Sequence, residues 1–163
     1  DPSRRALRVS LKMLDRPLRE RYEMLTIFME DERIPLVILQ RLWGLAEKRA
    51  EFDRTLVSLL RRSMFVEGGR EQGYVKLHDI QREVLPGSDD PRVAGWHAEV
   101  LRRCGSTQIG VEEEVAAGYW TGADGRRRFV HHATKAAFGG EYGEMAQVEV
   151  LDLSDCEQLT SLP

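Results

Sequence analysis

The apolar residues of the first sixty positions recur every three or four residues, which is the spacing of one face of an α-helix. Residues 4–14 form a first such segment, with leucines on one side at Leu7, Leu11 and Leu14. Pro17 stands at a favoured position for the start of a second helix. The buried stripe of this second helix is predicted to consist of Leu18, Tyr22, Leu25 and Met29.

Two further helices are predicted before residue 63. The segment IPLVILQRLWG is very apolar, has Pro35 near its start, and has Gly44 as a plausible stop. The segment EKRAEFDRTLVSLLRR carries charges opposite an apolar stripe, a pattern typical of an amphipathic helix. Its stripe consists of Phe52, Leu56, Leu59 and Leu60.

The hydrophobic period then shortens, which indicates β-strands. Residues 64–66 are predicted to form one strand, EGGREQG a turn, and residues 74–78 a second strand. A short helix over residues 80–85 follows, with Asp79 as its N-cap. Helices followed by a β-hairpin are the element order of a winged helix-turn-helix domain, which is predicted for residues 17–87.

The breaker-rich segment PGSDDP, residues 86–91, predicts a domain boundary. Beyond it, one helical face is predicted, and residues 111–120 and 126–138 are expected to form two more helices. Residues 88–146 are therefore assigned to a helical linker domain. The residues of the first helical face are Val93, Trp96, His97, Val100, Leu101 and Cys104.

The C-terminal segment VEVLDLSDCEQLTSLP has the apolar spacing of one leucine-rich repeat. A single repeat cannot bury its own apolar face, so further repeats are expected after Pro163. The predicted fold is mainly α with small β. Residues 1–16 end a preceding helical subdomain, residues 17–87 form the winged helix, residues 88–146 the linker, and residues 147–163 the first leucine-rich repeat.

Composition narrows the possible functions. The chain has 163 residues, 42% of them hydrophobic, and a formal net charge of −3, which argues against a strongly basic nucleic-acid or membrane-surface binder. No apolar run reaches membrane-spanning length. Cys104 and Cys156 lie far apart and are interpreted as thiols of a cytoplasmic protein. The chain starts with Asp1 and stops within a repeat pattern, so a longer parent polypeptide is expected.

Three segments together resemble a known family. LRERYEMLTIFMEDERIPLVILQRLWG, TLVSLLRRSMF and YVKLHDIQREVL are similar to the winged-helix (ARC) region of NB-ARC proteins. These signalling ATPases of the STAND class include plant-type NLR receptors and apoptotic protease-activating factor-like proteins. Leu77, His78 and Asp79 match the Met-His-Asp motif of the family, with leucine in place of methionine. The C-terminal LDLSDCEQLTSLP resembles the leucine-rich repeats of plant-type members.

The resemblance implies a regulatory role. In the family, the motif histidine, here His78, approaches the β-phosphate of bound ADP and holds the switch off. A helix N-terminus favours an anion, and Asp79 would support the site as the cap. The implied partners are the nucleotide-binding domain of the same polypeptide and protein ligands of the leucine-rich repeats. ADP or ATP is expected in the full-length parent only, and no cofactor is expected for this chain.

Catalytic and metal sites are not predicted. The sequence contains no GxxxxGK[ST] motif, so the chain is not expected to be an enzyme, and any slow ATPase activity belongs to the parent. His131, His132, His97 and Cys104 lack the ligand spacing of a zinc site. No serine has an elbow motif or a visible partner base.

Two alternative functions stay open. A DNA-binding winged helix would read the major groove with residues 47–62, whose arginines are interrupted by Glu47, Glu51 and Asp53. A nucleotide-independent protein-interaction scaffold is the other alternative. On the plainest interpretation, His78 is a surface histidine and Asp79 an ordinary helix cap.

Overall fold

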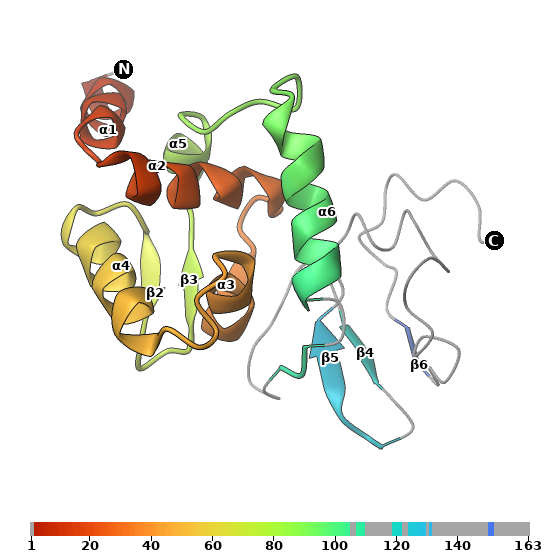
Figure 1. Ribbon diagram of the computed structural model, residues 1–163. Helices are drawn as coiled ribbons and strands as arrows, with labels where there is room; N and C mark the ends of the chain where they lie inside the picture. The colour runs from red at the N-terminus through yellow and green to blue at the C-terminus, as the bar shows by residue number, and fades with distance from the viewer. Residues whose placement is uncertain are drawn as a thin grey trace.

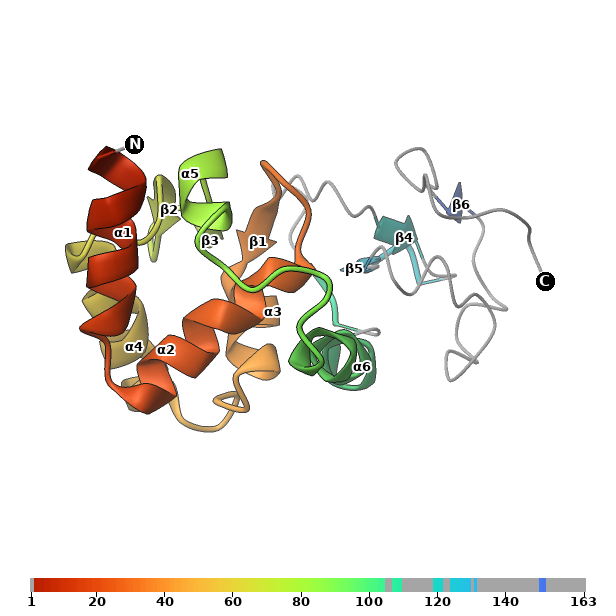
Figure 2. The same ribbon diagram turned by 90° about the horizontal axis from the view of Figure 1, so that it is seen from above.

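The computed structural model describes residues 2–104, 107–109, 119–121, 124–129, 131 and 150–151 (Figures 1 and 2). This part of the chain is mainly α with small β, as the sequence predicts, and its first sheet is a small three-stranded antiparallel one. A second small sheet follows α6. The elements are α1 (Pro2–Lys12), α2 (Arg16–Glu23), the 3₁₀ helix η1 (Met24–Ile27), β1 (Arg33–Pro35), α3 (Leu36–Leu42), α4 (Arg49–Arg61), β2 (Glu67–Gly69), β3 (Tyr74–Lys76), α5 (Asp79–Arg82), α6 (Arg92–Cys104), β4 (Tyr119–Thr121), β5 (Arg127–Phe129) and β6 (Val150–Leu151).

The first sheet has β3 between β1 and β2, with both pairs antiparallel. Val75 is the centre of β3, is fully buried, and lies opposite Ile34 and Gly68. Gly68 has φ +106°, and a Cβ there would lie 2.1 Å from the carbonyl oxygen of Tyr74. Only glycine fits this close approach of the two strands.

The helices pack a continuous apolar core around this sheet. Tyr22, Leu25 and Phe28 are fully buried, and the Tyr22 hydroxyl donates to the carbonyl of Met64 at 2.8 Å. Burial of the ring raises the pKa of the Tyr22 hydroxyl. The hydroxyl therefore serves as a neutral donor that ties α2 to the chain entering the hairpin.

Local signals explain where α2 begins. The Asp15 carboxylate accepts a hydrogen bond from the amide of Leu18 at 2.9 Å, which caps the helix. Pro17 lies in the first turn, where its missing amide hydrogen costs nothing. The predicted stripe is confirmed in part: Leu18 and Tyr22 of α2 and Leu25 of η1 are buried, whereas Met29 lies beyond η1 and is only partly buried.

The first strand of the hairpin lies later in the sequence than predicted. Residues 64–66 do not form a strand. Strand β2 instead comprises Glu67–Gly69, which was predicted as turn, although the amide of Val66 still donates to the carbonyl of Lys76 at 2.9 Å. The sequence analysis also missed β1, because a strand of three residues that ends in Pro35 is too short to show alternation. The helix predicted for residues 80–85 is the shorter α5.

The helix predicted over residues 126–138 is wrong at Arg127–Phe129, which form β5. The apolar spacing there was ambiguous, and pairing decides it: β4 lies between β5 and β6, and the amide of Phe129 donates to the carbonyl of Thr107 at 3.0 Å. Of the helix predicted for residues 111–120, the structure describes Tyr119 and Trp120. These two residues begin strand β4 and are not helical. The leucine-rich repeat predicted for residues 147–163 falls outside the described residues except for β6. The four predicted domains stay predictions.

Within the described ranges, we find no helix whose length and apolarity would allow it to cross a membrane.

Candidate functional site at the start of α5

His78 lies between β3 and α5, and its side chain is exposed. The Nδ1 atom of the ring accepts a hydrogen bond from the amide of Ile80 at 3.4 Å. The amide of His78 itself donates to the Oε1 atom of Gln81 at 2.8 Å. These two contacts form a capping box, so His78 is the N-cap of α5. Because Nδ1 is engaged as an acceptor, Nε2 is the ring nitrogen that points away from the cap and carries the hydrogen.

This arrangement corrects the role predicted for Asp79. Asp79 is the first residue of α5 and is exposed, whereas His78 has the extended backbone of a cap, with φ −87° and ψ 156°. The expectation of Asp79 as the cap followed from residue preference, because aspartate caps helices far more often than histidine does. The helix starts one residue earlier than the sequence suggested.

Gln81 is a functional neighbour that the sequence analysis missed. It is 7% exposed, and its Nε2 atom donates to the carbonyl of Ser63 at 2.8 Å while its Oε1 atom accepts from His78. Gln81 thus joins the start of α5 to the turn that follows α4. The glutamine three residues after the cap was a readable signal, because this is the spacing of a capping box.

Arg82 fixes the other end of α5. Its guanidinium donates to the carbonyl oxygens of Phe28 and Thr26, just after and within η1. Burial lowers the pKa of Arg82, although Glu30 and Glu32 act in the opposite direction. The arginine therefore supplies hydrogen bonds to the end of η1, where backbone carbonyls lack helical partners.

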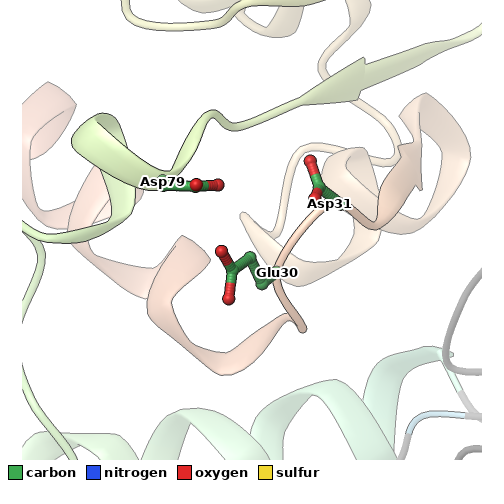
Figure 3. Close-up of side chains that lie close together, drawn as sticks. All are labelled: Glu30, Asp31 and Asp79. Atoms are coloured by element: carbon green, nitrogen blue, oxygen red, sulfur yellow. The ribbon is translucent and has the colours of Figure 1, made fainter.

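Three carboxylates gather beside the junction between β3 and α5: Glu30 and Asp31 come from the segment before β1, and Asp79 comes from α5 (Figure 3). One oxygen from each lies within 4.8 Å of the others, and all three residues are exposed. A hydrogen bond and charge repulsion from Asp79 raise the pKa of Glu30. Lys76 pairs with Asp31 at 3.3 Å and offsets part of the negative charge. Sequence could not reveal this cluster, because Asp79 is distant from Glu30 along the chain.

These contacts determine the chemistry at the junction between β3 and α5. His78 presents one ring nitrogen to solvent, while the carboxylates make the surroundings acidic. One donor next to three carboxylates does not by itself form an anion-binding pocket. An anion at His78 would therefore need additional donors. Exposed acidic groups of this kind are common without a bound cation, and no metal role follows from them.

Two further histidines, His97 of α6 and His131, lie close together beside η1. His131 is 1% exposed, and its Nε2 atom lies 3.0 Å from the carbonyl oxygen of Ile27. A carbonyl only accepts, so this nitrogen carries a hydrogen. The ring centroids of His97 and His131 are 5.2 Å apart, and burial lowers the pKa of His97. Sequence did not predict this approach. His132 lies outside the described residues.

The comparisons with known proteins give one distant relative. No model of a known protein family matches the chain. Apoptotic protease-activating factor 1 from Danio rerio is 26% identical over 99 residues, which are 60% of this chain and 8% of that protein. The chain thus spans less than a tenth of the length of the relative that it matches. This similarity is consistent with a signalling region of the NB-ARC type.

Proposed function

We propose that this chain is the regulatory region of an NB-ARC/STAND signalling switch. In this proposal, residues 17–87 form a winged-helix subdomain, and His78 contacts a phosphate of ADP held by a nucleotide-binding domain of the same polypeptide. The contact joins the two modules and holds the switch in its off state. The chain itself acts as a cytoplasmic, non-enzymatic arm, and leucine-rich repeats that begin near residue 147 bind protein ligands.

The observation that carries the proposal is the exposed imidazole at the start of α5, within a chain similar to apoptotic protease-activating factor 1. The His78 ring keeps Nε2 available as a donor because Nδ1 is occupied by the cap. Gln81 and Arg82 hold α5 to the rest of the molecule, so the histidine is presented by a fixed element. Loss of the nucleotide would remove the contact and change the balance between closed and open arrangements.

The test compares two substitutions at His78 in the polypeptide that contains both modules. His78→Ala removes the imidazole and the cap, whereas His78→Asp keeps a good cap and places a negative charge beside the phosphate. Both variants are expected to retain less ADP after purification and to raise basal signalling, with the aspartate at least as severe. ADP occupancy equal to that of the unchanged protein in both variants would rule out the phosphate contact. Retention in His78→Asp alone would show that only the cap matters.

The isolated chain is expected not to bind ADP measurably, because it offers one histidine in an acidic setting. Isothermal titration calorimetry of the 163-residue chain with ADP tests this point. Tight binding would mean that the chain holds the nucleotide by itself, contrary to the proposal.

The structure adds nothing in favour of DNA binding. On α4, Glu51 pairs with Arg21 at 2.5 Å, and Asp53 pairs with Arg70 of the hairpin at 2.9 Å. These pairs reduce the cationic surplus that backbone recognition needs. A gel shift with generic duplex DNA, repeated over a range of salt concentrations, separates the two functions. A nucleotide-independent scaffold would be indicated if His78 variants left ADP occupancy and signalling unchanged.

A further inference from the structure

Helix α1 has two apolar faces. Leu7 and Leu11, with Leu14 just beyond the helix, pack against the core and are between partly and almost fully buried. Other apolar residues recur at spacings of four, three and four on the side that faces away from the core, and thus follow one face of the helix. These outward residues are Pro2, Ala6, Val9 and Met13.

The outward face carries exposed apolar side chains. Val9 is 55% exposed and Met13 is 70% exposed, and the amide of Met13 donates to the carbonyl of Val9 at 3.0 Å, so the helical register continues to Met13. Together with Val57 and Val66 they are the large apolar residues with high exposure in the described part of the chain. The upper part of the stripe borders an open hollow lined by Pro2, Arg5, Ala6, Val9 and Ser10. We call these outward residues, with the cations described next, the α1 outer surface.

Cations run along one side of this stripe. Arg5, Arg8 and Lys12 recur at three- and four-residue spacing and are exposed. Within the described ranges, the structure records no ion pair for any of them. The chain as a whole has a formal net charge of −3, so this cationic row differs in sign from the average of the molecule.

The helix is held firmly enough to present this surface. Arg4 pairs with Glu83 just after α5, and the guanidinium Nη2 atom lies 2.9 Å from Oε1. Leu11 and Leu14 are 9% and 3% exposed and fix the opposite face. Figures 1 and 2 place α1 at the edge of the molecule that is remote from α6, where no described element covers its outer side.

We propose that the α1 outer surface binds an acidic amphipathic helix of a protein partner. The apolar stripe of α1 would pack against the apolar face of that helix, and its glutamates or aspartates would lie along Arg5, Arg8 and Lys12. The charge complementarity has a defined side, because the cations flank the stripe on one edge. This inference concerns the 163-residue chain and does not rest on the phosphate contact proposed for His78.

Other occupants fit the surface less well. An interfacial membrane helix carries large aromatic or leucine side chains on its buried face, whereas this stripe contains proline, alanine, valine and methionine. Nucleic acid would meet the cations, but the exposed stripe of Val9 and Met13 offers nothing to a phosphate backbone. A helix with one apolar face and one acidic edge uses both parts of the surface.

The test is fluorescence anisotropy with the full 163-residue chain and a labelled helical peptide. The peptide carries leucines on one face and glutamates along one edge, and a second peptide has lysines in place of the glutamates. The acidic peptide is expected to bind, with affinity that falls as salt is raised, and the basic peptide is expected to bind at least about tenfold more weakly.

Substitutions then locate the binding. Val9→Ser combined with Met13→Ser is expected to weaken binding of the acidic peptide by about tenfold or more, because two buried contacts are lost. The matched control is Val57→Ser combined with Val66→Ser, which removes similarly exposed valines outside the α1 outer surface and is expected to change affinity by about twofold at most. Arg5→Glu, Arg8→Glu and Lys12→Glu together are expected to reverse the preference in favour of the basic peptide.

Four outcomes would overturn the proposal: no binding of the acidic peptide, equal binding of both peptides, an equal loss in the control variant, or binding to anionic vesicles without binding to the peptide. Circular dichroism and thermal unfolding of each variant confirm that the fold is kept, which is expected because the substituted side chains are exposed.

Discussion

His78 and His131 lie in opposite surroundings, although each has a ring nitrogen bonded to the backbone. His78 is exposed and uses one nitrogen to cap α5, which leaves the other to solvent. His131 is 1% exposed, and its Nε2 atom donates to Ile27 between Phe28 and Phe129. The two histidines therefore have different structural roles. The buried imidazole holds segments together, and the exposed one leaves a ring nitrogen facing solvent.

The largest loss of unfolding free energy is expected from truncating Phe28, which packs against His131 in the buried site. Phe28 is fully buried, and its ring meets that of His131 edge to face at 5.9 Å. Phe28→Ala is expected to lower the free energy of unfolding by about 3–5 kcal/mol, because a large ring leaves a cavity. Urea denaturation measures the change, and Val66→Ala at a half-exposed position serves as the control, with an expected change within about 0.5 kcal/mol. A small effect of Phe28→Ala would mean that the buried site is not a structural joint.

At the exposed site around His78, a smaller loss of unfolding free energy is expected. It should follow from substitution of Gln81, the buried residue of that site. Gln81→Ala removes the acceptor for the His78 amide and the donor to Ser63, and is expected to cost about 1–3 kcal/mol of unfolding free energy. Gln72, an exposed glutamine in the turn between β2 and β3, provides the control as Gln72→Ala. Hydrogen exchange of the His78 amide is expected to accelerate in Gln81→Ala alone. Unchanged exchange would show that Gln81 does not fix the start of α5.

Acid should act on the half-buried His97. Burial lowers the pKa of His97 below its ordinary value of 6.5. In the unfolded chain the ring takes up a proton as the pH falls through 6.5, while the folded chain does not. His97 therefore makes stability decrease as the pH is lowered from 6.5 towards its folded pKa.

Urea denaturation at several pH values checks this dependence. His97→Gln is expected to flatten the decrease in stability relative to the unchanged chain, because glutamine does not titrate. An identical pH dependence in the two proteins would show that His97 does not carry it. This measurement sharpens the comparison, since it isolates the partly buried His97, which lies against His131 and has no counterpart at the exposed site.

The sequence predicted the helical part well because its periodicity was strong. Leu11, Leu14 and Tyr22 were assigned to buried stripes, and all three are buried. It failed at several strands of three residues: β1 was missed, β2 was placed too early, and β5 was predicted as helix. Such strands are fixed by pairing with distant segments, which local pattern does not contain.

The candidate site was half predictable. His78 was identified by resemblance and is exposed as that role requires, but no sequence rule favours an imidazole as helix cap. The acidic cluster depends on the approach of Glu30 to Asp79, and the contact of His97 with His131 depends on where residue 131 returns to α6. Both are products of tertiary packing.

The smallest effect is expected at His78 itself. His78→Ala removes a cap whose hydrogen bond is long, 3.4 Å, so the expected loss of unfolding free energy is about 0.5–1 kcal/mol. His78→Asp, which restores a strong cap, is expected to recover that loss in thermal or urea denaturation of the isolated chain. A loss in His78→Ala as large as that in Phe28→Ala would mean that the exposed histidine is also a structural joint. The contrast between the two sites would then disappear, and with it the reason to regard His78 as free to bind a ligand.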